Sequence, residues 1–329
     1  MFHSNFVIYP PISHSFYKIK ILFLTPFVSF ATKIKILLKQ VVFMNLLLVA
    51  NILWIFDEIF FPNYKKVQMK KPIFLLGGFR TGTTIIHRSL YEKRQNFISP
   101  RFLELLFPFL CVQYFFDFLE YCDTSYQTSF IAGIDSSLLK FFGKKIMSKH
   151  FISYDTPEED DILLSTYMGL GWYNIVQFPL FESWKTTGNL SLLSDQEKKR
   201  IGSFYHQCMQ KILFRRGQKS RGQEKQFLNK THLIALYPFW KTQYPDANFF
   251  LIERNFTEAF HSFILLNQFT NERFFNLQYS EQEYKKHHML FWKEMELAKK
   301  KIDCSGTILL EEFCKNKEAE LSSILRRIE

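Results

Sequence analysis

An apolar segment that leads into a glycine-rich turn constrains this chain more than any other feature. Residues 72–84 read PIFLLGGFRTGTT, which predicts a buried strand over residues 73–76 and a helix over residues 83–93. Gly77 and Gly82 have the spacing of a phosphate-binding loop, but Thr83 stands where a nucleotide triphosphatase carries lysine. The turn therefore predicts a site for an anionic group that is not built for Mg-ATP chemistry.

The donors around the turn support this prediction. Glycine permits positive φ and a close approach of the backbone to a ligand. The first N–H groups of the following helix have no partner within the helix, and the helix dipole adds partial positive charge. Arg80 adds a forked cation, and Thr81, Thr83 and Thr84 add hydroxyl groups. Such a set suits phosphate or sulfate oxygens, although a plain strand–helix turn with surface threonines is the simpler alternative.

Strand and helix patterns alternate along the rest of the chain. Further strands are predicted over residues 227–229, 248–252 and 307–310. Helices are predicted over residues 102–120, 195–214, 233–243, 257–268 and 281–301. Alternation of this kind is typical of an α/β fold with a parallel sheet covered on both faces.

Residues 1–71 differ from residues 72–329 and are predicted to form a hydrophobic, helical N-terminal segment. They hold apolar runs at residues 21–32 and 41–56, with lysines on either side. The second run is shorter than the roughly 20 residues of a membrane span. A helix packed on the main domain, an interfacial anchor and a single transmembrane span all stay open. Membrane association is favoured over a purely soluble appendage, so we expect a cytoplasmic or membrane-associated protein.

The net charge of +11 suits an anionic ligand or an anionic membrane surface. A nucleic-acid partner is not predicted, because the basic residues are spread over several segments, including a basic loop at residues 215–225, and form no recognisable module. The five cysteines show no C-x-x-C pair, and the adjacent His287 and His288 are interpreted as surface residues. No metal site is predicted.

Polar residues follow two of the later strands. Lys230 and His232 follow residues 227–229, Arg254 follows residues 248–252, and Ser262 lies two turns along the next helix. The carboxyl ends of parallel strands line one crevice, so these residues could face the same site as the loop. His232 could then act as a general base and Lys230 could stabilise a leaving oxygen, while Arg254 could grip a phosphate. Taken singly, each is more often an ordinary surface residue or helix start.

Together these pieces resemble the sulfotransferase superfamily that uses 3′-phosphoadenosine 5′-phosphosulfate (PAPS). The loop GFRTGTT at residues 78–84 resembles its 5′-phosphosulfate loop, and KTHL at residues 230–233 resembles the segment that carries its catalytic histidine. Arg254, Asn255 and Ser262 resemble its 3′-phosphate site. The similarity runs from about residue 60 to the end of the chain, and the spacing of the pieces agrees with the family.

The resemblance implies a P-loop-like three-layer sandwich. It also implies that a sulfuryl group is transferred from PAPS to a hydroxyl or amine of a small-molecule, lipid or carbohydrate acceptor. No metal is expected in this reaction. It implies catalytic roles for His232 as base and Lys230 at the bridging oxygen. The residues implied in PAPS binding are Arg80, Thr81, Gly82, Thr83, Thr84, Arg254 and Ser262.

Other branches of the superfamily use a glutamate base, for which Glu104 is the rival candidate and Glu159 a weaker one. Residues 156–159 read TPEE, which predicts a capping box. Glu159 and its acidic neighbours are therefore expected at a solvated helix start.

The sequence departs from the family pattern at three positions. Phe79 and Phe256 replace prolines, and Arg80 replaces the lysine of the cytosolic enzymes. No clear glycine-rich 3′-phosphate loop follows, so the adenine-side contacts are an open question. The alternatives are a P-loop nucleotide kinase or phosphotransferase, which the absent loop lysine disfavours, and a catalytically impaired, membrane-attached nucleotide-binding protein. The aromatic segments 102–120 and 163–184 could line an acceptor pocket or pack in the core.

Overall fold

The computed structural model describes residues 12–25, 28–171, 180, 194–218 and 225–328. Its sheet has five strands, all parallel, in the order β2-β3-β1-β4-β5. The strands are β1 (Ile73–Gly77), β2 (Phe97–Ile98), β3 (Gln226–Thr231), β4 (Asn248–Glu253) and β5 (Gly306–Leu309). The predicted parallel α/β sheet is confirmed. The sequence pattern did not predict β2, because two residues are too few to show a strand periodicity.

The central strand β1 is buried on both faces, and its side chains alternate between two cores. Phe74 and Leu76 belong to the larger core, which includes residues of α11 (Asp195–Gln218) and α12 (Tyr237–Gln243). Ile73 and Leu75 belong to the smaller core with α3 (Thr83–Lys93) and α16 (Lys317–Ile328). Helices therefore cover both faces, as in a three-layer sandwich.

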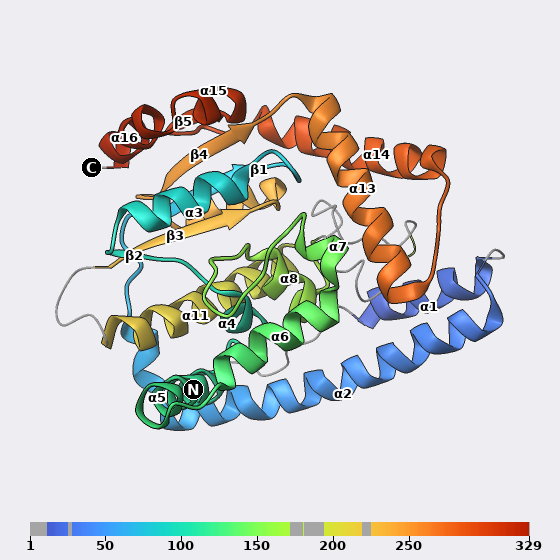
Figure 1. The fold of residues 1–329 in the computed structure, drawn as a ribbon, viewed down its shortest axis with the longest axis horizontal. Helices are drawn as coiled ribbons and strands as arrows, with labels where there is room; N and C mark the ends of the chain where they lie inside the picture. Colours follow the sequence, from blue (N-terminus) through green and yellow to red (C-terminus); the bar gives the residue numbers. More distant parts are fainter. Residues whose placement is uncertain (1–11, 26–27, 172–179, 181–193, 219–224, 329) are drawn as a thin grey trace.

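The other elements complete these layers (Figure 1). The described helices not yet named are α1 (Ile12–Leu24), α2 (Phe30–Phe60), η1 (Pro62–Lys66), α4 (Phe102–Leu106), α5 (Leu110–Tyr126), α6 (Phe130–Phe142), α7 (Lys144–Met147), α8 (Asp161–Met168), η4 (Ile234–Leu236), α13 (Phe256–Phe275), α14 (Glu281–Lys299) and α15 (Leu310–Lys315). The capping boxes that precede α11 and α14 form, with Ser194 and Ser280 paired to glutamates three residues on.

Two predicted helices are divided in the structure. The helix expected over residues 102–120 is broken between α4 and α5, where Pro108 lacks an N–H group and disfavours helical backbone at Phe107. The carboxylate of Asp57 then accepts the N–H groups of Leu110 and Cys111 at 2.6 and 3.1 Å, which starts α5. The helix expected over residues 233–243 is likewise split into η4 and α12.

Three surface predictions are wrong. The capping box at residues 156–159 does not form: α8 begins at Asp161, and residues 158–161 are buried. Arg215 belongs to α11 and is buried, so the expected basic loop begins later. His288 is buried and hydrogen bonded to Asn267 at 3.2 Å. Most of the aromatic segment 163–184, and residues 219–224 of the basic loop, lie outside the described residues.

The apolar run at residues 41–56 is part of the 31-residue helix α2, which lies along the side of the molecule formed by α5 and α6 (Figure 1). Among the described residues, α2 is the one helix long and apolar enough to cross a membrane. Leu47, Ala50 and Trp54 pack into the larger core. The division of the chain at residue 71 stays a prediction.

Candidate functional site

The loop between β1 and α3 adopts a backbone that its residue types explain. Gly82 has φ +88°, and a Cβ there would lie 2.3 Å from Leu310 Cδ1, so only glycine fits. Arg80 also has a positive φ, of +64°. Thr81 is buried, and its hydroxyl donates to the Gly78 carbonyl at 2.7 Å. Thr81 therefore holds the shape of the loop, while the loop ends at the N-terminus of α3.

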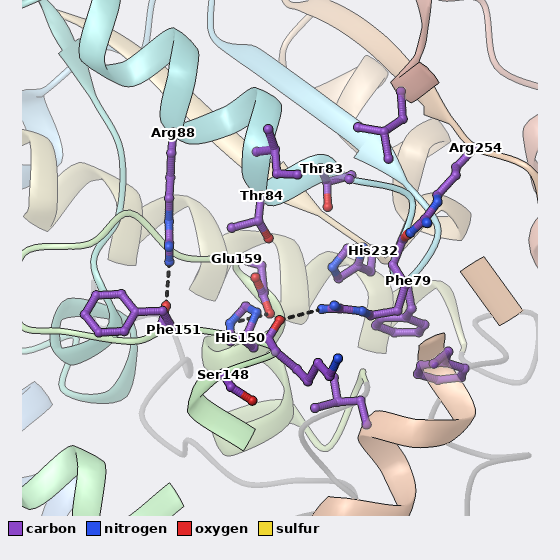
Figure 2. A pocket seen from close by; sticks show the side chains of 17 residues that line it. Phe79, Thr83, Thr84, Arg88, Ser148, His150, Phe151, Glu159, His232 and Arg254 are labelled. Atoms are coloured by element: carbon purple, nitrogen blue, oxygen red, sulfur yellow. Dashed lines mark hydrogen bonds and ion pairs between the residues drawn. The ribbon is translucent and has the colours of Figure 1, made fainter. Parts of the chain in front are cut away.

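A pocket of about 330 Å³ lies at this N-terminus (Figure 2). Arg80, Gly82, Thr83 and Thr84 line it from the loop and α3. Further lining includes His232 beyond β3, Arg254 beyond β4, Glu159 before α8, and residues 148–151 beyond α7. The carboxyl ends of neighbouring parallel strands thus meet at one pocket, as the sequence predicted for this edge of the sheet.

Two arginines form one wall of the pocket. Arg80 Nε donates to Ser262 Oγ at 3.0 Å, which brings the predicted Ser262 to this wall. Arg254 Nη1 donates to the Arg80 carbonyl at 3.2 Å and pairs with Glu258 at 2.8 Å. Burial lowers the pKa of Arg80, and the neighbouring Arg254 lowers it further, against the opposing effect of Glu159. Cations held this close to each other favour an anion between them.

His232 is held as a neutral ring with a defined tautomer. Its Nδ1 lies 2.8 Å from the Gly77 carbonyl, which can only accept, so the proton is on Nδ1 and the lone pair on Nε2. Burial lowers the pKa of His232 to about 4. Phe79 lies between this ring and Phe263, with ring centroids 4.6 and 4.8 Å away. Phenylalanine at position 79 therefore packs the imidazole in place.

Lys230 reaches the first turn of α3 but is not among the described residues that line the pocket. Its side chain is fully buried, and Nζ donates to Thr84 Oγ1 at 2.9 Å in the first turn of α3. Nζ also forms an ion pair with Glu159. Burial alone would raise the pKa of Glu159, but the ammonium of Lys230 holds it well below its usual range. The β3 strand thus brings an ammonium group to a loop that lacks the lysine of a nucleotide triphosphatase.

Residues 158–161, here called the acidic brace, hold the end of β3. The Asp160 N–H donates to the Lys230 carbonyl at 3.3 Å, and its carboxylate accepts from Asn229 at 2.7 Å. Burial raises the pKa of Asp160 to about 7 and that of Asp161 well above its usual value. These contacts explain why the expectation of a solvated helix start was wrong. The feature of the sequence that could have indicated this burial is a run of four acidic residues beside an apolar helix in a basic chain.

Two residues of the brace and His150 form the one described group with metal-ligand geometry. Atoms of His150, Glu158 and Glu159 lie within 4.8 Å of one another. Glu158 is paired with Arg88 at 2.8 Å, and Glu159 with Lys230. Because cationic side chains already neutralise both carboxylates, the geometry fits an ion-pair network better than a metal centre.

Glu104 lies elsewhere and is not among the described residues that line the pocket. Its carboxylate pairs with Arg215 and with Arg216, the latter at 2.8 Å, and accepts the Arg101 N–H at 2.9 Å. Burial raises the pKa of Glu104, but the three arginines together hold it below its usual value. Glu104 therefore ties α4 to α11, and the structure does not bring it to the site of His232.

Comparisons with known proteins support this fold. The structure of the sulfotransferase STF1 from Mycobacterium tuberculosis H37Rv is similar at a TM-score of 0.65 and 19% identity, over 85% of this chain and 73% of that one. The structure of the sulfotransferase STF9 from Mycobacterium avium is similar at a TM-score of 0.65 and 13% identity. That match covers 93% of this chain and 74% of the STF9 chain. A comparison with curated proteins gives no match. The model of a sulfotransferase family matches residues 72–329. This chain therefore belongs to the sulfotransferase family.

Proposed function

We propose that the protein transfers a sulfuryl group from PAPS to a hydroxyl or amine of an acceptor. One observation carries this proposal: Arg80, His232 and Arg254, from three separate strand ends, line a pocket at the N-terminus of α3, and Lys230 bonds to Thr84 in the first turn of that helix. An anion site, a second cation and a neutral imidazole are the parts that sulfuryl transfer needs, because positioning and charge stabilisation dominate such reactions.

The residues present fit PAPS, which when bound supplies the activated sulfuryl group and a separate 3′-phosphate. Arg80, Thr83 and Thr84 suit the 5′-phosphosulfate, because the N–H groups and dipole at the start of α3 favour an anion. Arg254 and Ser262 suit the 3′-phosphate. In the free protein Arg254 pairs with an exposed glutamate, and such exposed pairs are weak enough to exchange for a bound anion.

His232 is suited to remove the proton of the acceptor. Its Nε2 carries the lone pair, and an anion bound nearby would raise the pKa of the ring toward a useful range for a base. Lys230 is suited to stabilise negative charge on the oxygen that leaves. Glu159 is a poorer base than His232, because the Lys230 ammonium stabilises its ionised form.

Ligand-dependent thermal unfolding tests the proposal. We expect PAPS to raise the unfolding temperature and ATP with Mg²⁺ to raise it little; stabilisation by ATP with Mg²⁺ alone would instead support a P-loop kinase. Arg80→Ala should remove the PAPS effect. His232→Ala should keep PAPS binding but lose PAPS consumption with a panel of phenols, alcohols and amines. If PAPS neither binds nor is consumed, the proposed reaction is wrong.

A further inference from the structure

Helix α2 exposes more apolar surface than its packing on the rest of the protein requires. Leu47, Ala50, Trp54 and Asp57 are buried at helical spacing, so one face of α2 packs inward. Around this face, apolar side chains that are 50–66% exposed include Leu38, Val42, Leu46, Val49, Ile52 and Ile59. A helix in contact with water alone would carry polar residues at these exposed positions. The exposed apolar side of α2 therefore indicates contact with an apolar partner.

Helix α2 is tied to the rest of the protein at two places along its length. Near its C-terminal end, the Asp57 carboxylate is fully buried and pairs with Lys211 at 3.0 Å. In its N-terminal half, Lys39 Nζ donates to the Phe274 carbonyl at the end of α13 at 2.8 Å. A helix crossing a bilayer would have to leave the protein surface at one of these places. The contacts therefore suit a helix that lies flat, as Figure 1 shows it beside α5 and α6.

The charges along α2 identify the partner. No charged residue occurs over residues 40–56. Lys33 and Lys35 precede this stretch, and Lys66 follows α2 in η1, where the neighbouring Lys65 pairs with Glu58. Lysines at both ends of an apolar helix face match anionic lipid headgroups around an acyl-chain boundary. A second copy of the chain is the alternative occupant of this face, and the experiment below distinguishes it from a lipid surface.

We propose that α2 binds in the plane of an anionic phospholipid leaflet, with its exposed apolar face among the acyl chains and its flanking lysines at the headgroups. This proposal is independent of the proposed reaction. Flotation of the full chain with phosphatidylcholine vesicles tests it, with and without phosphatidylglycerol. We expect the protein to float with both and more strongly with the anionic vesicles.

Substitutions on the exposed face sharpen the test. Val42→Glu and Ile52→Glu should each weaken vesicle binding at least about tenfold, because each removes a side chain of the size that contributes a tenfold factor or more when buried. Leu297→Glu is the matched control, since this residue of α14 is 61% exposed and apolar but lies outside α2. Lys35→Gln with Lys66→Gln should remove the preference for phosphatidylglycerol. Circular dichroism checks that each variant is folded.

Three outcomes would overturn the proposal. Equal flotation of Val42→Glu, Leu297→Glu and the unaltered protein would show that α2 is not the membrane-binding surface. A dimer that Val42→Glu dissociates, without vesicle binding, would assign the face to a second copy. An N-terminal tag distinguishes the orientations after synthesis in the presence of vesicles: it stays accessible to protease if α2 lies in plane, whereas a spanning helix would leave the tag or the catalytic domain protected.

Discussion

Replacing Glu159 by glutamine tests whether its ion pair with Lys230 holds the end of β3 in place. The Lys230 side chain is 0% exposed and that of Glu159 is 5% exposed. Removing one partner of a buried pair leaves an uncompensated charge and costs about 3–5 kcal/mol. Glutamine keeps the shape and one acceptor oxygen, and Thr84 keeps its bond to the ammonium. We therefore expect a loss at the lower end of this range, about 3 kcal/mol in the free energy of unfolding.

Urea unfolding at neutral pH, followed by circular dichroism, measures this loss. Glu258→Gln is the matched control, because its pair with Arg254 is exposed and should contribute less than about 1 kcal/mol. The proposed function adds a second measurement. An anion bound beside the unpaired Lys230 should offset part of the loss, so PAPS should stabilise Glu159→Gln more than the unaltered protein.

The reasoning is refuted if Glu159→Gln costs no more than Glu258→Gln, because solvent would then screen a pair that the structure buries. A further variant identifies the cause of a larger loss. Glu159→Gln combined with Lys230→Met removes the buried charge along with its partner and should recover much of the stability. A loss that persists in the double variant would come from packing instead of charge.

Three other predictions follow from the site. Burial raises the pKa of Asp160 to about 7, so the native state keeps this proton longer than the unfolded chain, and Asp160 contributes a loss of stability as pH rises from 5 to 8, opposite in sign to the contribution of His232. In urea unfolding, Asp160→Asn should therefore make the change in stability between pH 5 and pH 8 more favourable by about 2–3 kcal/mol than in the unaltered protein. His232, with its pKa lowered to about 4, should be neutral and protonated at Nδ1 in NMR spectra of the free protein at neutral pH; an Nε2–H tautomer would contradict the assigned geometry. Gly82→Ala should lower the free energy of unfolding by at least about 2 kcal/mol in thermal unfolding, because φ is positive and the new Cβ meets Leu310. The control Gly133→Ala should raise it by about 0.5–1 kcal/mol, because the new Cβ there meets nothing within 4 Å.

Local sequence patterns predicted much of the fold and part of the site. The apolar run of β1, the turn at Gly82 and the capping boxes before α11 and α14 involve residues only a few positions apart, so their chemistry can be read directly. The ends of β3 and β4 were predicted to meet the loop because parallel strands end at one edge. The structure places His232 and Arg254 at that edge.

The roles of the charged residues could not be predicted in this way. Glu104 and Glu159 are both acids that follow the loop, yet Glu104 pairs with arginines of α11 and Glu159 pairs with Lys230 at the pocket. The acidic brace has the pattern of a helix start but lies in the interior. A buried charge is stable only beside a partner, and these partners lie up to about a hundred positions away in the chain, where no local pattern reveals them.

The sequence by itself determined a glycine-rich turn between a buried strand and a helix, because glycine conformations and apolar periodicity are local properties. Only the tertiary structure decided how that turn is completed. The parallel register of β1 with β3 brings the Lys230 ammonium to Thr84 and the His232 ring to the Gly77 carbonyl. The loop lacks a lysine of its own, and the neighbouring strand provides one because the sheet places their ends together.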